Sequence, residues 1–127
     1  MKPALLPDEY VLSVKLKEAP KRGDIVVFTN TEKNIDVVKR VIGLPNENVS
    51  SSDGEIIINS EKIDDEWSKD LTDDFVSVEL GDDEIFVLGD QRNMSTSDSR
   101  TLGPIKYEDC WKLKVRYWPY HRFNIYE

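Results

Sequence analysis

Residues 36–45 read Asp-Val-Val-Lys-Arg-Val-Ile-Gly-Leu-Pro. The branched apolar residues around Lys39 predict a buried β-strand, and the glycine and proline at its end predict a turn. A charged lysine is costly to bury among valine and isoleucine side chains. Two interpretations of Lys39 follow. Either its ammonium group reaches water at the edge of the sheet, or burial lowers its pKa and yields a neutral amine that can act as a general base.

Other strands are predicted on both sides of this one. Residues 10–16 alternate apolar and polar side chains, and residues 25–28 form a continuous apolar run that is typical of a strand covered on both faces. Because short polar turns separate these segments from the strand at 35–44, the three predict an antiparallel meander. The segment 101–105 is predicted to be extended. Further strands are predicted at 55–58, 84–88 and 112–118.

The composition fits one domain over residues 1–127. Of the 127 residues, 39% are hydrophobic and 33% are charged, and this length suits a single core. The net charge of −8 is uneven, because residues 61–84 hold eleven acidic and two basic side chains. We interpret this acidic segment as a solvated, partly flexible insertion. Without a basic surface to bind phosphate, nucleic acid is not an expected partner.

The usual signatures of metal and cofactor sites are missing. With Cys110 and His121 as the single cysteine and histidine, a conventional structural zinc site is excluded, and Cys110 is predicted to be a small core residue. Glycine-rich motifs for phosphates or dinucleotides are absent, and no serine stands in a turn that marks a nucleophile. Lys39 remains as a candidate, because a neutral amine can take the proton of a serine hydroxyl.

A polar loop at 89–100 follows the predicted strand at 84–88. Polar loops at the end of a core strand are common places for function. Serine, aspartate and asparagine side chains also bond to their own backbone and so stabilise irregular loops. From this pattern alone, a structural and a functional interpretation of the loop both stay open.

Several short stretches, spread along nearly the whole chain, form a recognisable pattern when they are taken together in order. They are Met1-Lys2-Pro3-Ala4-Leu5, the segments 22–28 and 38–45, Leu88-Gly89-Asp90-Gln91-Arg92, Asp98-Ser99-Arg100, Gly103-Pro104-Ile105 and Arg116-Tyr117-Trp118-Pro119-Tyr120. In order and spacing they resemble the blocks of bacterial type I signal peptidases, which are membrane-anchored serine-lysine endopeptidases. This resemblance implies a mainly β extracytoplasmic domain, with antiparallel sheets or a partly open barrel and little helix.

The resemblance also implies roles for individual residues. Lys39 takes the place of the general base. Asp98 and Arg100 stand where the family has a supporting aspartate and arginine beside the lysine strand, and Asp90 and Arg92 are further scaffold residues. The family needs neither a metal ion nor an organic cofactor, and none is expected here. Its substrates are the signal peptides of exported preproteins.

Residues near the amino end and in the loop have implied roles as well. Ser95 or Thr96 would supply a hydroxyl that orients the lysine, and the choice stays open because this loop is one residue longer than usual. Met1 and Pro3 would contact the substrate. The nucleophilic serine of the family directly precedes the methionine that corresponds to Met1. We therefore expect the serine and a single membrane anchor upstream, and no activity from this chain alone.

The sequence departs from the family pattern at Ala4, Asn46-Glu47, Gln91 and Trp111, where Thr, Gly-Asp, Asn and Gly are usual. Two explanations stay open. The chain is part of an active peptidase, which the presence of Lys39 favours. Alternatively, its parent is a non-catalytic relative that binds surface proteins such as pilus subunits and assists their assembly, which the departures favour. A generic β-domain without a peptide role is a third, weaker interpretation.

Overall fold

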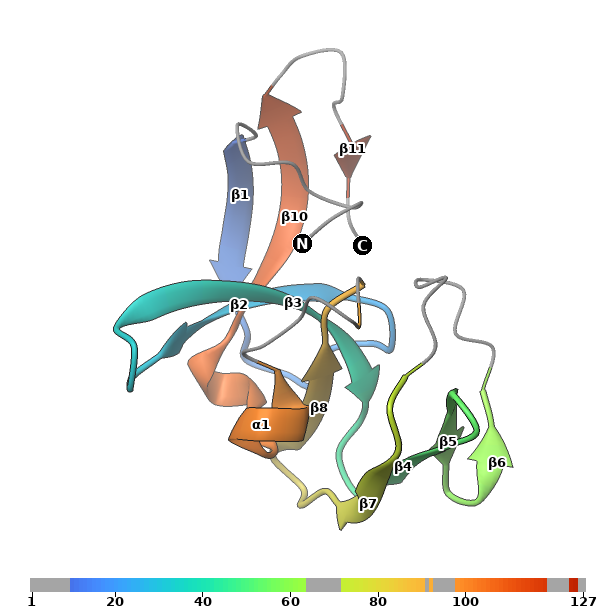
Figure 1. The fold of residues 1–127 in the computed structure, drawn as a ribbon. Helices are drawn as coiled ribbons and strands as arrows, with labels where there is room; N and C mark the ends of the chain where they lie inside the picture. Colours follow the sequence, from blue (N-terminus) through green and yellow to red (C-terminus); the bar gives the residue numbers. More distant parts are fainter. Residues whose placement is uncertain (1–9, 64–71, 91, 93–97, 119–123, 126–127) are drawn as a thin grey trace.

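The computed structural model describes residues 10–63, 72–90, 92, 98–118 and 124–125, and this part of the chain is built mainly of β-strands (Figure 1). The strands are β1 (Tyr10–Lys15), β2 (Ile25–Asn30), β3 (Ile35–Gly43), β4 (Asn48–Ser52), β5 (Glu55–Ile58), β6 (Glu61–Lys62), β7 (Phe75–Glu79), β8 (Glu84–Leu88), β9 (Ile105–Lys106), β10 (Trp111–Trp118) and β11 (Asn124–Ile125). Helix is limited, in the same residues, to α1 (Ser99–Leu102) and the 3₁₀ turn η1 (Tyr107–Asp109). The predicted mainly β, antiparallel fold with little helix is confirmed. None of the described helices is long and apolar enough to cross a bilayer.

The strands form two antiparallel sheets. The larger sheet has the order β1-β10-β2-β3-β8-β9, with β11 paired to β10, and the smaller sheet has the order β6-β5-β4-β7. The predicted three-strand meander is therefore wrong, because β10 lies between β1 and β2. Trp111 of β10 pairs with Lys15 on one side and with Val27 on the other. The connection over residues 16–24 is longer than a tight hairpin turn, so it does not force β1 and β2 to pair.

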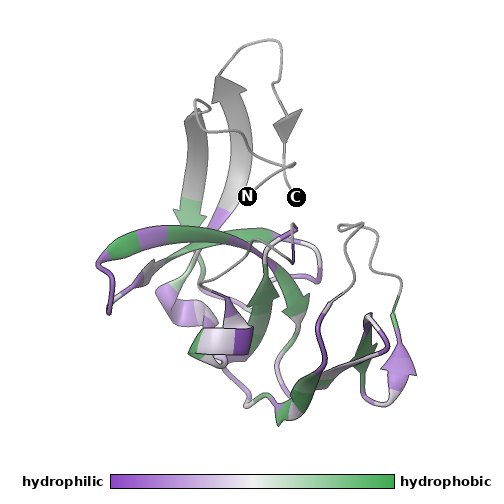
Figure 2. Ribbon diagram, in the orientation of Figure 1, coloured by the Kyte–Doolittle hydropathy of each residue, from purple (hydrophilic) through white to green (hydrophobic). Residues whose placement is uncertain are grey.

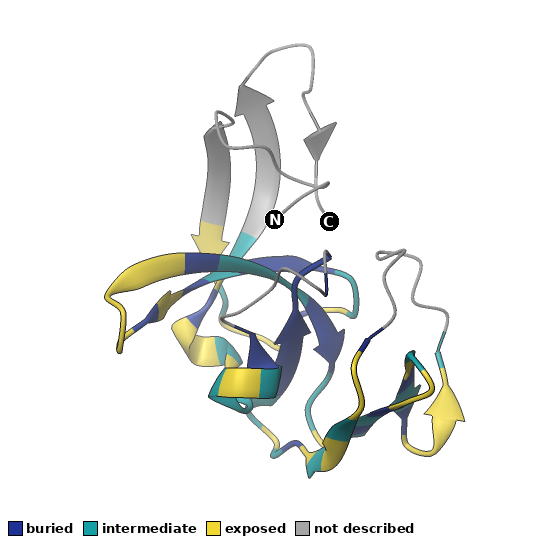
Figure 3. Cartoon of the chain, in the orientation of Figure 1, coloured by how far each residue is buried: buried dark blue, intermediate teal, exposed yellow. Residues whose placement is uncertain are grey.

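Strand β8 belongs to two hydrophobic cores. Its side chains alternate, with Ile85 and Val87 in the core of the larger sheet and Phe86 and Leu88 in a second core shared with the smaller sheet. This double burial explains the continuous apolar run, since neither face of the strand meets water. Figures 2 and 3 show β8 as mainly apolar and buried, and its first residue, Glu84, is only partly buried. Cys110 lies fully buried in the first core, as predicted, and burial raises the pKa of its thiol to about 12.

Part of the acidic segment belongs to the smaller sheet. Strand β7 pairs with β4, and Phe75 stacks on Phe86 with ring centroids 5.1 Å apart. Leu80 is buried in the second core and Val78 packs against that core, so the inward side chains of this segment are attached to the rest of the molecule. Residues 64–71 of the predicted insertion lie outside the described residues.

Gly43 ends β3 where the chain passes toward the smaller sheet. A Cβ here would lie 2.6 Å from Cγ2 of Val49, 2.9 Å from Cδ1 of Leu80 and 2.9 Å from Cβ of Phe86. Because these separations are far below van der Waals contact, we expect Gly43→Ala to lower the free energy of unfolding by about 1–3 kcal/mol in urea denaturation. Gly81→Ala is the control, since its Cβ would meet a flexible carboxylate at 3.1 Å. Equal losses in the two variants would contradict this packing argument.

Candidate active site

Lys39 lies in the middle of β3. It pairs with Val26 of β2, and the next residue, Arg40, pairs with Leu88 of β8, so strands flank it on both sides. Its side chain is half-buried, and this desolvation lowers the pKa of the amine. The negative charge of Asp98 acts against that lowering, and the positive charge of Arg100 adds to it. The pKa of Lys39 is therefore lowered, which is the direction that the general-base interpretation requires.

Asp98 and Arg100 form an ion pair at the start of α1. The Asp98 carboxylate is 1% exposed and accepts the backbone N–H of Arg100 at 2.9 Å, which caps the short helix. It also accepts Nη2 of Arg100 at 2.7 Å and Nε at 3.2 Å. The prediction that residues 101–105 are extended is therefore wrong for Thr101 and Leu102, because these two residues continue the helix that Asp98 caps. The hydroxyl of Ser99 accepts the backbone N–H of Val87 at 2.9 Å and so attaches α1 to β8.

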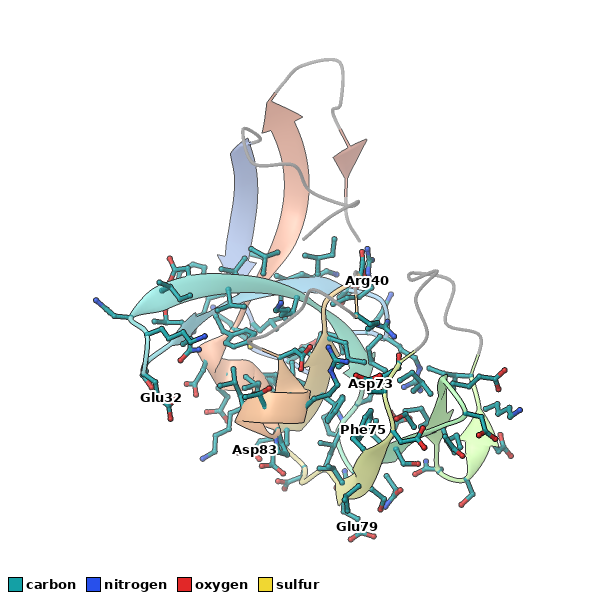
Figure 4. The ribbon with its side chains drawn as sticks, viewed as in Figure 1. Glu32, Arg40, Asp73, Phe75, Glu79 and Asp83 are labelled. Atoms are coloured by element: carbon teal, nitrogen blue, oxygen red, sulfur yellow. The ribbon has the colours of Figure 1, made fainter. Side chains whose placement is uncertain are left out.

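Arg40, the residue after Lys39, forms a buried ion pair with Asp90. Nε and Nη2 of Arg40 donate to the two carboxylate oxygens of Asp90 at 3.0 and 2.9 Å. The side chains of Arg40 and Asp90 are only 12% and 2% exposed. Arg40 also donates to the carbonyl of Gly23 at 2.8 Å, and it is labelled in Figure 4. The pair thus holds together β3, the end of β8 and the turn before β2, and the charge of Asp90 also acts to raise the pKa of Lys39.

Arg92 connects the loop after β8 to two other elements. Its guanidinium group is buried and donates to the carbonyl of Gly89 at 2.7 Å and to the hydroxyl of Thr72 at 2.8 Å. Its own carbonyl accepts Nη2 of Arg100 at 2.9 Å. Asp90, Arg92, Asp98 and Arg100, which the sequence resemblance selects, therefore lie around one end of β8 beside Lys39.

Some predicted site residues lie outside the described residues, and their roles stay predictions. They are Met1, Pro3, Ser95 and Thr96, together with the departures at Ala4 and Gln91. For the part of the chain that is described, no group of three or more histidine, cysteine, aspartate and glutamate side chains is arranged to hold a metal ion.

The sequence reasoning missed the contact between Arg22 and Glu47. Nη1 and Nη2 of Arg22 each donate to a carboxylate oxygen of Glu47 at 2.8 Å, and Nη1 also donates to the carbonyl of Ile42 at 2.7 Å. Burial alone would raise the pKa of Glu47, but the hydrogen bonds from Arg22 and from the backbone N–H of Leu44 lower it. Asn46 has a φ of 67°, a left-handed conformation that asparagine tolerates. The departure from Gly-Asp to Asn46-Glu47 therefore keeps a well-bonded turn after the lysine strand.

Two arginine contacts around the candidate site had no local signal in the sequence. Arg22 and Glu47 are 25 residues apart, and Arg92 and Thr72 are 20 residues apart. Their side chains carry no periodicity or motif that relates one to the other, and only the folded chain brings them together.

Comparison with known proteins assigns the chain to a family. Residues 1–118 match the family described as signal peptidase, peptidase S26. The chain is 32% identical over 123 residues to signal peptidase I P of Bacillus subtilis subsp. natto, covering 86% of this chain and 66% of that protein. It is 35% identical over 119 residues to signal peptidase I of Bacillus caldolyticus, covering 81% and 64%.

A solved structure supports the same assignment. The crystal structure of a signal peptidase I from Enterococcus faecalis V583 is similar with a TM-score of 0.64 and 29% identity, over 73% of this chain and 94% of that chain. Against the curated relatives the chain spans from 50% to 66% of their length. The chain belongs to the signal peptidase family, peptidase S26, as the order of its sequence blocks predicted.

Proposed function

We propose that this chain is the extracytoplasmic catalytic domain of a signal peptidase I that removes signal peptides from exported preproteins with a serine and Lys39. The observation that carries the proposal is the half-buried amine of Lys39, whose pKa is lowered and which Asp98 and Arg100 flank. Membership of the family supports the class of substrate. Because the chain spans only part of its curated relatives, the activity of the whole protein is itself part of the proposal.

The proposed reaction is acyl transfer through an activated serine. The neutral amine of Lys39 takes the proton from a serine hydroxyl, and the serine oxygen attacks the carbonyl carbon of the scissile peptide bond. Collapse of the tetrahedral intermediate breaks the C–N bond, and the Lys39 ammonium group gives the proton to the leaving amine. Water then hydrolyses the acyl-enzyme with Lys39 again acting as base. The proposed nucleophile is a serine that directly precedes Met1 in the parent protein.

The alternative is a non-catalytic relative that binds surface proteins such as pilus subunits. Its support is the set of departures from the family pattern. The structure weakens one of them, because Asn46 and Glu47 form a turn held by Arg22. Trp111 occupies a surface position, 45% exposed, where the Nζ of Lys15 lies 5.5 Å from the centre of its ring. Neither departure disturbs the surroundings of Lys39, so we favour the enzyme.

A cleavage assay tests the proposal. The parent protein, with its residues upstream of Met1 and inserted in lipid vesicles, is expected to cut an exported preprotein once, after its signal sequence. Changing the upstream serine to alanine is expected to abolish the cut, because the nucleophile is lost, while residues 1–127 alone are expected to be inactive. The products are identified by mass spectrometry.

Three results would contradict this proposal in different ways. A parent protein that carries the serine but leaves exported preproteins uncut would refute the enzyme. Binding of a surface subunit without cleavage would select the alternative. Cleavage by residues 1–127 alone would show that a different hydroxyl is the nucleophile.

A further inference from the structure

The smaller sheet contacts the proposed active site through Thr72. Thr72 is 2% exposed, and its backbone N–H donates to the carbonyl of Gly54 at 3.1 Å, at the turn between β4 and β5. The hydroxyl of Ser51 fixes the next residues, donating to the carbonyl of Asp73 at 2.6 Å and accepting the N–H of Phe75 at 3.1 Å. Figure 4 shows Asp73 and Phe75 where this segment enters β7. Thr72 is therefore held in place by the backbone of the smaller sheet.

The hydroxyl of Thr72 accepts a hydrogen bond from a buried cation. Its Oγ1 lies 2.8 Å from Nη1 of Arg92, whose side chain is almost fully buried. A guanidinium group keeps its charge at all ordinary pH values and has five N–H donors to satisfy. Hydrogen bonds from an ionised donor are stronger than those between neutral groups. The position of Arg92 is thus fixed in part by the smaller sheet and in part by the carbonyl of Gly89.

The backbone of Arg92 is also linked to the charged groups that act on Lys39. The carbonyl of Arg92 accepts Nη2 of Arg100 at 2.9 Å, and Nη2 of Arg100 also donates to the Asp98 carboxylate at 2.7 Å. Both Asp98 and Arg100 act electrostatically on Lys39, and Asp90 does so as well. Hydrogen bonds at both ends of Arg92, its guanidinium group and its backbone carbonyl, therefore link Thr72 to the two charges that act on the amine.

We propose that Thr72 is a positioning residue, whose hydroxyl holds Arg92 and, through Arg92 and Arg100, holds the Asp98 carboxylate in place beside Lys39. The inference rests on the proposed function, because it concerns the same amine. It assigns to the acidic segment a role that its charge pattern does not indicate. The segment supplies one fixed hydroxyl beside the smaller sheet, and this contact adds a hydrogen bond to the hydrophobic core that already joins the two sheets.

Two variants of Thr72 test the effect of the hydroxyl separately from the effect of the side-chain shape. Thr72→Val keeps the shape and removes the hydroxyl, whereas Thr72→Ser keeps the hydroxyl. We expect Thr72→Val to raise the pKa of Lys39, because a loosened Arg100 no longer offsets the charge of Asp98 and water reaches the amine. Thr72→Ser is expected to restore the value. The measurement is an NMR titration of the Lys39 side chain in residues 1–127, which needs no peptidase activity.

A matched control is Thr29→Val. Thr29 is exposed on β2 and its hydroxyl donates to Asp36 of β3 at 2.8 Å, so the variant also removes a threonine hydroxyl from the larger sheet. It is expected to leave the Lys39 titration unchanged. In the parent protein, Thr72→Val is expected to lower kcat by about tenfold or more with KM unchanged, because the base is misplaced while substrate contacts remain.

The possible outcomes separate this inference from the proposed function. A wild-type Lys39 that titrates at the ordinary lysine value would refute both. A lowered wild-type pKa that Thr72→Val leaves in place would refute the role of Thr72 alone, and so would equal shifts in Thr72→Val and Thr72→Ser. A loss of thermal stability without a change in the Lys39 titration would show a merely structural contact. If Thr72→Val does not fold, Thr72→Ala also removes the hydroxyl and is compared with Thr72→Ser in its place.

Discussion

Replacing Lys39 by methionine is expected to lower kcat/KM of the parent peptidase by about 10²- to 10⁴-fold, the usual contribution of a general base. Methionine has a similar length and fits the half-buried position on β3, but it cannot accept a proton. In the wild-type protein, kcat/KM is expected to rise with pH through a midpoint below the ordinary lysine value of about 10.4, because in the proposed mechanism only the neutral amine acts as base and its pKa is lowered by burial. The measurement is the rate of signal-peptide cleavage as a function of pH. A variant that keeps the activity and the same pH profile would remove Lys39 from the mechanism.

The same substitution changes how stability depends on pH. Because the pKa of Lys39 is lowered in the folded chain, the unfolded chain binds more protons between the folded and the unfolded pKa. The free energy of unfolding therefore rises with pH across this window and levels off above the unfolded value of about 10.4. Lys39→Met is expected to remove this contribution, seen as the difference between the two proteins in urea denaturation at a series of pH values. Parallel curves for the two proteins would show that the pKa of Lys39 is not lowered.

Asp90→Ala is expected to lower the free energy of unfolding by about 3–5 kcal/mol, because it removes the carboxylate that pairs with a buried guanidinium group. The affected group is Arg40, which is 12% exposed and makes two hydrogen bonds to Asp90. A loss of this size is a large share of the about 5–15 kcal/mol that stabilises a typical domain. Asp90→Asn keeps the shape of the side chain and is expected to cost less. The measurement is urea denaturation.

The control for this prediction is an ion pair of the same type on the surface. Nζ of Lys62 lies 2.8 Å from Oε2 of Glu55, but both side chains are at least half exposed. Glu55→Ala is expected to cause no measurable loss, since water and salt screen an exposed pair. If Asp90→Ala and Glu55→Ala lose the same stability, burial does not decide the effect and the argument for Arg40 and Asp90 is wrong.

The strands could be predicted from the sequence more reliably than their neighbours in the sheet. The apolar residues 85–88 predict β8 because all four of their side chains are buried, and the run at 25–28 predicts β2 in the same way, with three of its four side chains buried. The pairing of β1 with β10 was not predictable from the turn at 16–24, because β10 comes from the other end of the chain. The pattern of apolar residues within a segment indicates whether its side chains are buried. The order of the strands in a sheet depends instead on contacts between distant segments.

The sequence alone was enough to predict the family, the longer strands of the larger sheet and the candidate base. The blocks around Lys39, Asp90 and Asp98 identified the family because each block lies within a few residues of chain, where order and spacing can be recognised. The side-chain partners around the site, such as Asp90 for Arg40 and Thr72 for Arg92, came from the folded structure alone. A hydrogen bond of a buried charged group depends on distance and desolvation in the folded chain, and neither quantity is encoded within one segment.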